Sequence, residues 1–390
     1  MNSTTSSLIN EVNWARLTHA YGVATDAPGS LRALVQDDDE AFGFALDYLY
    51  SAVLHQGTVY PATAPSLRAV AEMLDQDIAR RPAPDSSSRL AGLLGWIDAV
   101  AESASWCQDL EFPDVPAPSE EELAAYFRDL ENDDWSPEVG QYLEAQAAAA
   151  LPGACASALP AVGPFLTDAD DDVRLAALDA YVRLAALQED KAAMTAPLSE
   201  ALKAATARDE RARLVLGLGD LAGDTTAWLS DDDPAVRACA AMALPRSPEA
   251  TAILVDLLQD PLAADEWFDS PPSRFDIRVH FDLLANLLAR DITPAEVLPA
   301  CLAAIRVARG GIWSDMTWGP ILAATFPGVV APPGARPEPP ASLDEPQRAV
   351  LGALVENDAL WDPRDGNARR ARRQVGLPDE REEVARLIGA

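Results

Sequence analysis

Apolar residues recur with the period of an α-helix along most of the chain, and strict alternation of apolar and polar residues is rare. Residues 171–187 show this most clearly, with helically spaced apolar positions at Val173, Ala176, Ala177, Ala180, Tyr181, Leu184 and Leu187. Arg174, Asp179 and Arg183 fall outside this stripe. The pattern predicts an amphipathic helix whose narrow alanine stripe suits a closely packed neighbour.

Similar segments follow one another, separated by short joints rich in Asp, Pro and Gly. The predicted helices span 10–20, 28–35, 40–54, 64–79, 87–105, 119–131, 137–150, 156–166, 171–187, 191–205, 209–221, 234–244, 248–258, 276–289, 294–308, 318–325, 343–356 and 379–388. Helix pairs with short joints, repeated along a chain, are typical of a solenoid. The sequence therefore predicts an all-α fold, an α-solenoid of irregular helical hairpins.

A short pattern, D-x-x-V-R, recurs at 170–174 and 233–237, and "DERAR" at 209–213 is a weaker copy. The aspartates are placed to cap a helix by accepting a backbone N–H, and Pro234 fits the first helical position. Each arginine is then expected to bond an aspartate of its own or the next repeat. The predicted structural ladder consists of Asp170, Arg174, Asp209, Arg213, Asp233 and Arg237.

The longer segments "LTDADDDVRLAALDA" and "LSDDDPAVRACAAMA" resemble the bacterial HEAT repeat, including the subtype named for phycobilisome lyases. The two copies cover residues 166–245, and "HQGT-x-Y-x-AT" and "WGP" segments are similar to those of uncharacterised actinomycete HEAT-repeat proteins. The resemblance implies HEAT-like hairpins. It says almost nothing about function, because one fold hosts many functions.

Proline-rich and acidic stretches divide the chain. We predict N-terminal HEAT-like repeats at 1–106, an acidic, proline-rich insertion at 107–136 and central repeats at 137–326. A proline-rich linker at 327–342 and a C-terminal helical cap at 343–390 complete this division.

The stretch "HQGTVYPATAP" at 55–65 contains stop and start signals for helices. His55 is expected to end one helix, and Gly57 to take the left-handed conformation that follows a helix end. The chain before Pro61 is extended, and Thr63 is placed to cap the next helix. No nucleophile or carboxylate is near His55 in the sequence, so we interpret this stretch as a joint rather than a catalytic loop.

Charge narrows the choice of partner, because 62 acidic residues face 30 basic ones and give a net charge of −32. Such a chain repels nucleic acids, whose binders carry basic stripes. It suits a basic protein partner, or the charge serves solubility alone. Only Lys191 and Lys203 are lysines, which together with the many alanines indicates a GC-rich genome.

The terminus lacks the pattern of a secretory signal, and no apolar run of about 18 residues predicts a membrane span. Four isolated cysteines, Cys107, Cys155, Cys239 and Cys301, predict reduced thiols in the cytoplasm and no zinc ribbon.

Motifs for catalysis or for cofactor and metal binding are not found. The aspartate clusters lack the glycine and glutamate of a calcium loop. His19, His55 and His280 are expected on separate repeats without H-E-x-x-H spacing, and phosphate-binding glycine motifs are absent. We therefore predict no catalytic, cofactor-binding or metal-binding residues and no enzymatic activity.

Tryptophan is enriched at binding hot spots, which makes four tryptophans candidates for partner binding. Trp313 and Trp318 flank a glycine-rich break, and Trp135 and Trp267 lie in acidic loops. The alternative is that these rings pack beneath loops. The only basic cluster, 364–373, is expected to pair with acidic groups of the same chain, or else to dock an acidic partner.

These features predict a cytoplasmic, non-catalytic scaffold or binding protein whose surface holds a protein partner, and the acidic charge favours a basic one. Neutralisation of a basic toxin or nuclease is one alternative, since negative charge accelerates such an encounter. A structural subunit that holds several proteins together is another. An enzyme of the HEAT-like DNA glycosylase or lyase type is disfavoured by the acidic charge.

Overall fold

The structure is a computed structural model that describes residues 3–82, 88–108, 110–112, 114–130, 136–275, 277–328, 337 and 342–389. The chain divides into two compact units. Unit 1 comprises Met1–Ala205 and Asp220–Gly223, and unit 2 comprises Thr206–Gly219 and Asp224–Ala390. Most of the described residues are helical and strands form only one short hairpin among them, so the all-α prediction is confirmed.

Unit 1 contains α1 (Ser3–Glu11), α2 (Ala27–Ala33), α3 (Asp39–Tyr48), α4 (Thr63–Ala71), α5 (Arg89–Gln108), α6 (Glu120–Asp129), α7 (Pro137–Val162), α8 (Asp171–Ala186) and α9 (Thr195–Ala204). Short helical turns connect them at η1 (Trp14–Arg16), η2 (Leu49–Val53), η3 (His55–Gly57), η4 (Asp77–Arg80), η6 (Gly163–Thr167) and η7 (Lys191–Met194). A small antiparallel hairpin, β1 (Thr18–His19) with β2 (Gly22–Val23), lies between α1 and α2.

Unit 2 contains α10 (Arg208–Asp220), α11 (Pro234–Met242), α12 (Pro248–Leu257), α13 (Pro261–Asp265), α14 (Val279–Leu288), α15 (Pro294–Val307), α16 (Trp318–Thr325), α17 (Glu345–Glu356), α18 (Gly366–Gln374) and α19 (Arg381–Ile388). Its short turns are η8 (Thr226–Ser230), η9 (Ile312–Asp315) and η10 (Asp358–Leu360).

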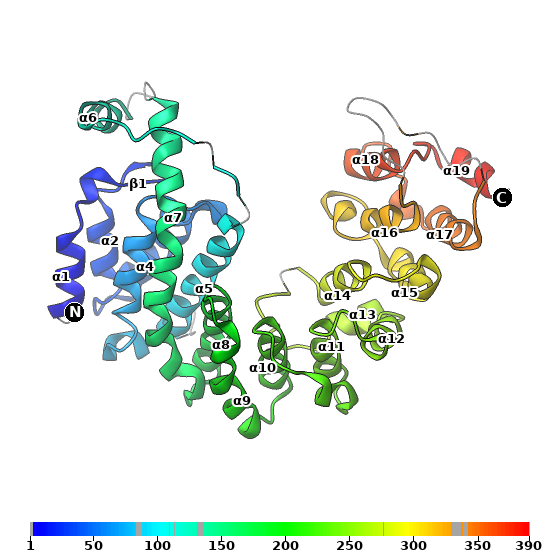
Figure 1. Ribbon diagram of the computed structural model, residues 1–390, viewed down its shortest axis with the longest axis horizontal. Coiled ribbons are helices and arrows are strands. Elements are labelled where there is room, and N and C mark those ends of the chain that lie inside the picture. The colour runs from blue at the N-terminus through cyan, green and yellow to red at the C-terminus, as the bar shows by residue number, and fades with distance from the viewer. Residues whose placement is uncertain are drawn as a thin grey trace. The chain divides into compact units, whose positions relative to one another are not determined.

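Helices pack in pairs within each unit. In unit 1, α7 runs along α4 and α5, and α8 packs against both α5 and α7 (Figure 1). In unit 2, α11 packs against α12, α14 against α15, and α15 against α17. Packing thus joins both neighbours in sequence, such as α11 and α12, and helices two or three apart in the chain, such as α5 and α8.

The apolar stripe predicted for 171–187 lies inside unit 1. Val173, Ala177, Ala180, Tyr181 and Leu184 are buried. Arg183, outside that stripe, reaches Asp98 at 2.8 Å and Glu102 at 3.0 Å on α5. The helix is thus held by apolar burial on one face and by ion pairs beside it.

The predicted helix at 10–20 is wrong, because α1 ends at Glu11 and the hairpin β1–β2 follows η1. Backbone bonds from distant segments fix this hairpin. The Ala20 N–H donates to the Ala52 carbonyl at 3.0 Å, and the Ala62 N–H donates to the Thr18 carbonyl at 3.1 Å. A short stretch of sequence cannot reveal these partners, because they lie far away in the chain.

The predicted break between 150 and 156 is also wrong, because α7 continues through Pro152 and Pro160. A proline inside a helix removes one backbone hydrogen bond and is normally disruptive. Here the helix persists with Leu151, Ala154 and Cys155 fully buried on its inner face. The burial of this face compensates for the lost bond.

The continuity of α7 creates a stretch, Pro137–Thr167, that is long and apolar enough to cross a membrane by length and composition alone. This corrects the expectation that no apolar run reaches that length. The same stretch packs against α4, α5 and α8, and 39% of its most apolar window is buried inside the structure.

The predicted insertion at 107–136 holds α6, whose first turn has a capping box between Ser119 and Glu122. Most of the predicted linker at 327–342 lies outside the described residues. The basic cluster, for which no helix was predicted, forms α18 with Asp365 as its cap. The other proposed boundaries remain predictions.

Candidate functional site

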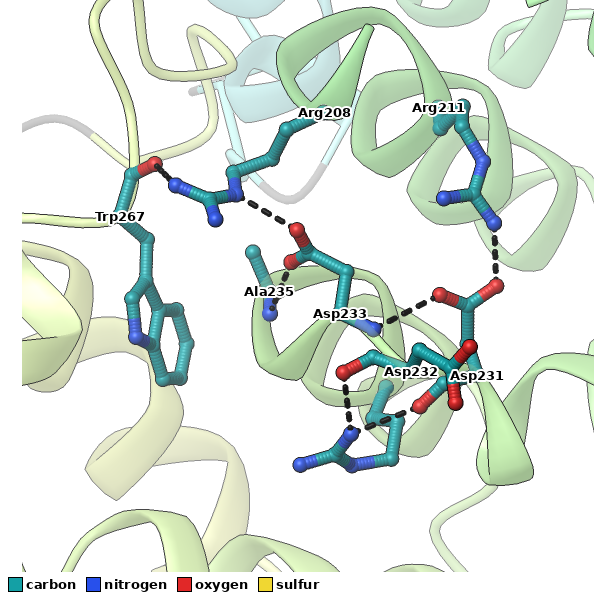
Figure 2. Close-up of polar contacts among 8 residues, drawn as sticks. Arg208, Arg211, Asp231, Asp232, Asp233, Ala235 and Trp267 are labelled. Atoms are coloured by element: carbon teal, nitrogen blue, oxygen red, sulfur yellow. Dashed lines mark hydrogen bonds and ion pairs between the residues drawn. The ribbon is translucent and has the colours of Figure 1, made fainter. Parts of the chain in front are cut away.

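The second D-x-x-V-R copy forms a closed loop at the start of α11 (Figure 2). The Asp233 carboxylate caps the helix by accepting the Ala235 N–H at 2.9 Å. The Asp231 carboxylate accepts the Asp233 N–H at 3.0 Å. Arg237 folds back and donates to the backbone oxygens of Asp231 at 2.7 Å and Asp232 at 3.1 Å.

Two arginines of α10 bind this loop from outside. Arg208 Nε lies 2.6 Å from Asp233 Oδ2, and Arg211 pairs with Asp231. Arg208 also donates to the Trp267 carbonyl at 2.9 Å, so it connects α10, the start of α11 and the segment after α13 (Figure 2). The inter-helix ion pairs therefore come from arginines that the repeat pattern does not contain.

The first copy repeats this arrangement at the start of α8. Asp170 caps the helix through the Asp172 N–H at 3.0 Å, and Asp168 accepts the Asp170 N–H at 3.1 Å. Arg174 donates to the Asp168 carbonyl at 2.7 Å. An external arginine, Arg80 of η4, lies 2.9 Å from the Asp168 carboxylate. The two loops thus have matching hydrogen bonds at matching sequence positions.

The aspartate pairing expected for the repeat arginines is found for Arg174, which reaches Asp171 Oδ1 at 2.7 Å. Arg237 differs, because its guanidinium donates to the backbone oxygens of Asp231 and Asp232. Carbonyl groups at a helix start are near enough to satisfy the guanidinium locally, which leaves the neighbouring carboxylates for arginines of other helices.

The third copy departs from the pattern. Helix α10 begins at Arg208, so Asp209 lies inside the first turn and is not the cap that was predicted. Its carboxylate accepts the Ser270 N–H at 2.7 Å. The buried Arg213 donates to the carbonyls of Ser270 at 2.8 Å and Pro271 at 2.7 Å. This pair fixes the loop after α13.

The stretch 55–65 forms a helix joint. His55 donates from Nδ1 to the Ser51 carbonyl at 2.9 Å, and Gly57 takes a left-handed conformation with φ of +78°. Thr63 is the first residue of α4 rather than its cap. Its hydroxyl accepts the Tyr60 N–H at 2.9 Å and donates to the Val53 carbonyl at 2.7 Å, bridging the turn that contains Pro61.

Two histidines meet at this joint, contrary to the expectation that all three lie on separate repeats. The ring of Tyr21 lies 6.2 Å from the ring of His19 and 5.7 Å from that of His55. The sequence did not indicate this, because residues 18–20 were assigned to a helix predicted at 10–20.

Below Tyr21, a polar chain runs through His19, which is buried. The Tyr21 N–H donates to His19 Nδ1 at 3.0 Å, which leaves Nε2 as the donor to Asp26 Oδ1 at 3.0 Å. The Tyr48 hydroxyl also donates to Asp26, at 2.9 Å. Burial raises the pKa of Asp26, but the hydrogen bonds from His19 and Tyr48 hold it below its ordinary value. Burial and the Asp26 carboxylate raise the pKa of Tyr48.

The third histidine is fixed in unit 2. His280 Nδ1 and its backbone N–H both donate to Asp265, the ring at 2.9 Å. Arg278 adds an ion pair to the same carboxylate at 3.1 Å. Asp265 therefore stabilises the start of α14 from α13, which is a structural task.

The candidate tryptophans have different environments. Trp318 is fully buried and stacks near Arg372, so it cannot contact a partner in this structure, contrary to its prediction. Trp313 is 39% exposed beside the exposed Ile312 and Met316. Trp267 is half-buried, and Trp135 lies outside the described residues.

Close packing against neighbouring atoms explains the glycines of the break before Trp313. A Cβ on Gly310 would lie 2.6 Å from Asp365 Oδ2 and 3.0 Å from the Ala359 carbonyl oxygen. The Gly311 N–H donates to the same carboxylate. The break therefore packs against the cap of α18, and its glycines have a structural role.

The cysteines are free thiols, and three of them are buried. Burial raises the pKa of Cys155 and Cys301 to about 12, which opposes formation of the nucleophilic thiolate. In the described part of the chain, no group of three or more His, Cys, Asp or Glu side chains is arranged to hold a metal ion.

Comparison with models of known protein families gives no match, and comparison with curated proteins gives none either. The likeness to HEAT repeats therefore depends on the residues of the two matching copies.

Proposed function

We propose that this protein is a non-catalytic binding or scaffold protein, built on a solenoid of irregular HEAT-like hairpins, that holds a basic protein partner. The matching loops at Asp168–Arg174 and Asp231–Arg237 support the repeat, since equal spacing gives equal hydrogen bonds in both. Solenoids of this type present extended surfaces to other proteins.

The charge of the chain is the observation that carries the proposal. The net charge is −32, and residues 1–205 alone hold 33 acidic and 11 basic residues. Residues 206–390 hold 29 acidic and 19 basic residues, so the excess is largest in the N-terminal half. An electrostatic field of this sign attracts a basic partner and speeds its association.

The local chemistry supports binding over catalysis. His55 and His280 each donate from the ring to a carbonyl or carboxylate that they help to position. The buried thiols favour their protonated form. Reduced thiols also agree with a cytoplasmic location, which we include in the proposal.

Affinity capture by the full chain from the cells that make it, followed by reconstitution of the purified pair, tests this function. We expect one stoichiometric partner of high isoelectric point. Its association rate should fall steeply as salt rises from about 50 to 200 mM, because salt screens the steering field. An acidic partner, or a rate unaffected by salt, would contradict the proposal.

Neutralisation of a basic toxin or nuclease is a second candidate function, favoured by the same negative charge. The same experiment distinguishes neutralisation from scaffolding. If the captured partner cleaves nucleic acid, stoichiometric addition of the chain should suppress that cleavage. Retained cleavage in the complex would favour scaffolding instead.

A further inference from the structure

Two large aromatic side chains remain exposed on either side of the helix joint in unit 1. Tyr21 is 68% exposed and Trp106 is 57% exposed. The Tyr21 ring lies against His55, and the Trp106 ring lies 3.2 Å from where a Cβ on Gly57 would be. We define Tyr21, His55 and Trp106 as the joint patch.

The joint patch is held on rigid supports. The Tyr21 backbone is fixed by its bond to His19, and His19 is fixed by Asp26. Trp106 lies near the end of α5, a helix packed against α7 and α8. Exposed aromatic rings on a fixed backbone bind with a small loss of conformational entropy.

Carboxylates accompany the aromatic rings. The Asp26 side chain is 58% exposed although it bonds His19 and Tyr48. Glu144 of α7 is exposed. Helix α7 packs along α4, which begins at Thr63 at the end of the joint, so this carboxylate lies on a helix beside the joint. Burial and then the charge of Glu144 raise the pKa of Tyr60.

Exposed aromatic rings near carboxylates suit the positively charged side chain of an arginine or a lysine. A guanidinium or ammonium group over an exposed Trp or Tyr ring gains about 0.5–1 kcal/mol, and more when it is desolvated. A second copy of this chain fits less well, because two molecules of net charge −32 repel each other.

We propose that the joint patch, with Asp26 and Glu144, docks an arginine- or lysine-bearing segment of a basic protein partner. This inference rests on the function proposed above and gives it a location. It assigns the rings to contact with the cation and the carboxylates to charge pairing.

Fluorescence anisotropy on the full chain tests the docking site, with a labelled decapeptide of alternating arginine and serine as the probe. We expect Tyr21→Ala and Trp106→Ala each to weaken binding about two- to fivefold, the size of a lost cation–π contact. Tyr21→Phe should bind like the wild type because it keeps the ring. Leu262→Ala, which removes an exposed large apolar side chain of unit 2, is the matched control and should have no effect.

The possible failures are distinct. If Trp106→Ala and Leu262→Ala give the same affinity, the patch is not the site, and the proposed basic partner then binds elsewhere on the chain. If the wild type does not bind the peptide at 50 mM salt, both the site and the proposed function are overturned. If sedimentation shows a dimer that Tyr21→Ala dissociates, the patch is an interface between copies and the inference is wrong. Unchanged melting curves of the variants exclude unfolding as the cause.

Discussion

Arg80 lies 2.9 Å from Asp168, and this pair occupies the same place in its loop as the pair of Arg211 with Asp231. Both aspartates stand two residues before a helix cap, and both accept the N–H of that cap. Burial raises the pKa of Asp168, while the Asp170 N–H and Arg80 lower it below its ordinary value. The loop thus joins a helix start to a preceding helical segment.

Asp233→Ala should destabilise unit 2, because it removes the cap of α11 and the partner of Arg208. We expect the free energy of unfolding to fall by about 0.5–2 kcal/mol, the range for a lost N-cap. Urea denaturation followed by circular dichroism measures this. Asp232→Ala is the matched control, since its side chain is exposed and its backbone oxygen is kept; it should change stability by less than about 0.5 kcal/mol. Equal effects of the two variants would contradict the capping role.

Gly57→Ala should lower the melting temperature, because φ of +78° is strained for any residue with a Cβ. The added Cβ would also crowd Trp106 at 3.2 Å. For Gly153→Ala we expect the opposite effect on stability. This glycine lies inside α7, is exposed and has open space around its Cβ position. It should stabilise the helix by about 0.5–1 kcal/mol. If Gly57→Ala raised the melting temperature, the left-handed conformation assigned to Gly57 would be wrong.

Arg290→Met should destabilise unit 2 strongly. Arg290 is only 6% exposed and donates to the Ala241 carbonyl at 2.6 Å and to Thr251 at 2.9 Å, so it satisfies the C-terminal end of α11. Burial lowers its pKa. Each lost hydrogen bond has a charged donor, and such bonds contribute about 1.5–3 kcal/mol. A thermal melt measures this effect. Arg246→Met, which alters an exposed arginine lining the same pocket as Arg290, is the control and should change the melting temperature little.

The Asp265 carboxyl should make the stability of unit 2 depend on pH. Burial raises the pKa of this carboxyl, but hydrogen bonds from His280 and the ion pair with Arg278 hold it below the ordinary value. A depressed carboxyl pKa stabilises the fold fully above the unfolded value, about 3.9, and this contribution is lost as pH falls through the folded value. The difference in urea midpoint between the wild type and Asp265→Asn should therefore shrink below about pH 4. A difference that stays constant from pH 7 to pH 3 would contradict the assignment.

The helical period of apolar residues located most helices because burial of one face is encoded locally. Val173 and Leu184 are buried as their spacing predicted. The caps at Asp170 and Asp233 could also be predicted, since a cap bonds backbone groups two or three residues away. Gly57 is similar, because its left-handed conformation belongs to a local joint.

Other features depend on residues far apart in the chain. The hairpin at 18–23 was missed, and its first strand was placed in a predicted helix at 10–20, because its backbone partners, Ala52 and Ala62, are remote. The arginines that pair with the repeat loops, Arg80 and Arg211, stand outside the repeat pattern and meet it only in the packed unit.

The sequence by itself determined the all-α class, the two equivalent loops and the acidic charge, because periodicity, caps and composition are local or additive. The tertiary structure alone decided which side chains are exposed together. It buried Trp318, and it brought Tyr21 and His55 together while leaving Trp106 exposed beside Gly57. Packing determines exposure, and packing depends on contacts between segments that no local pattern records.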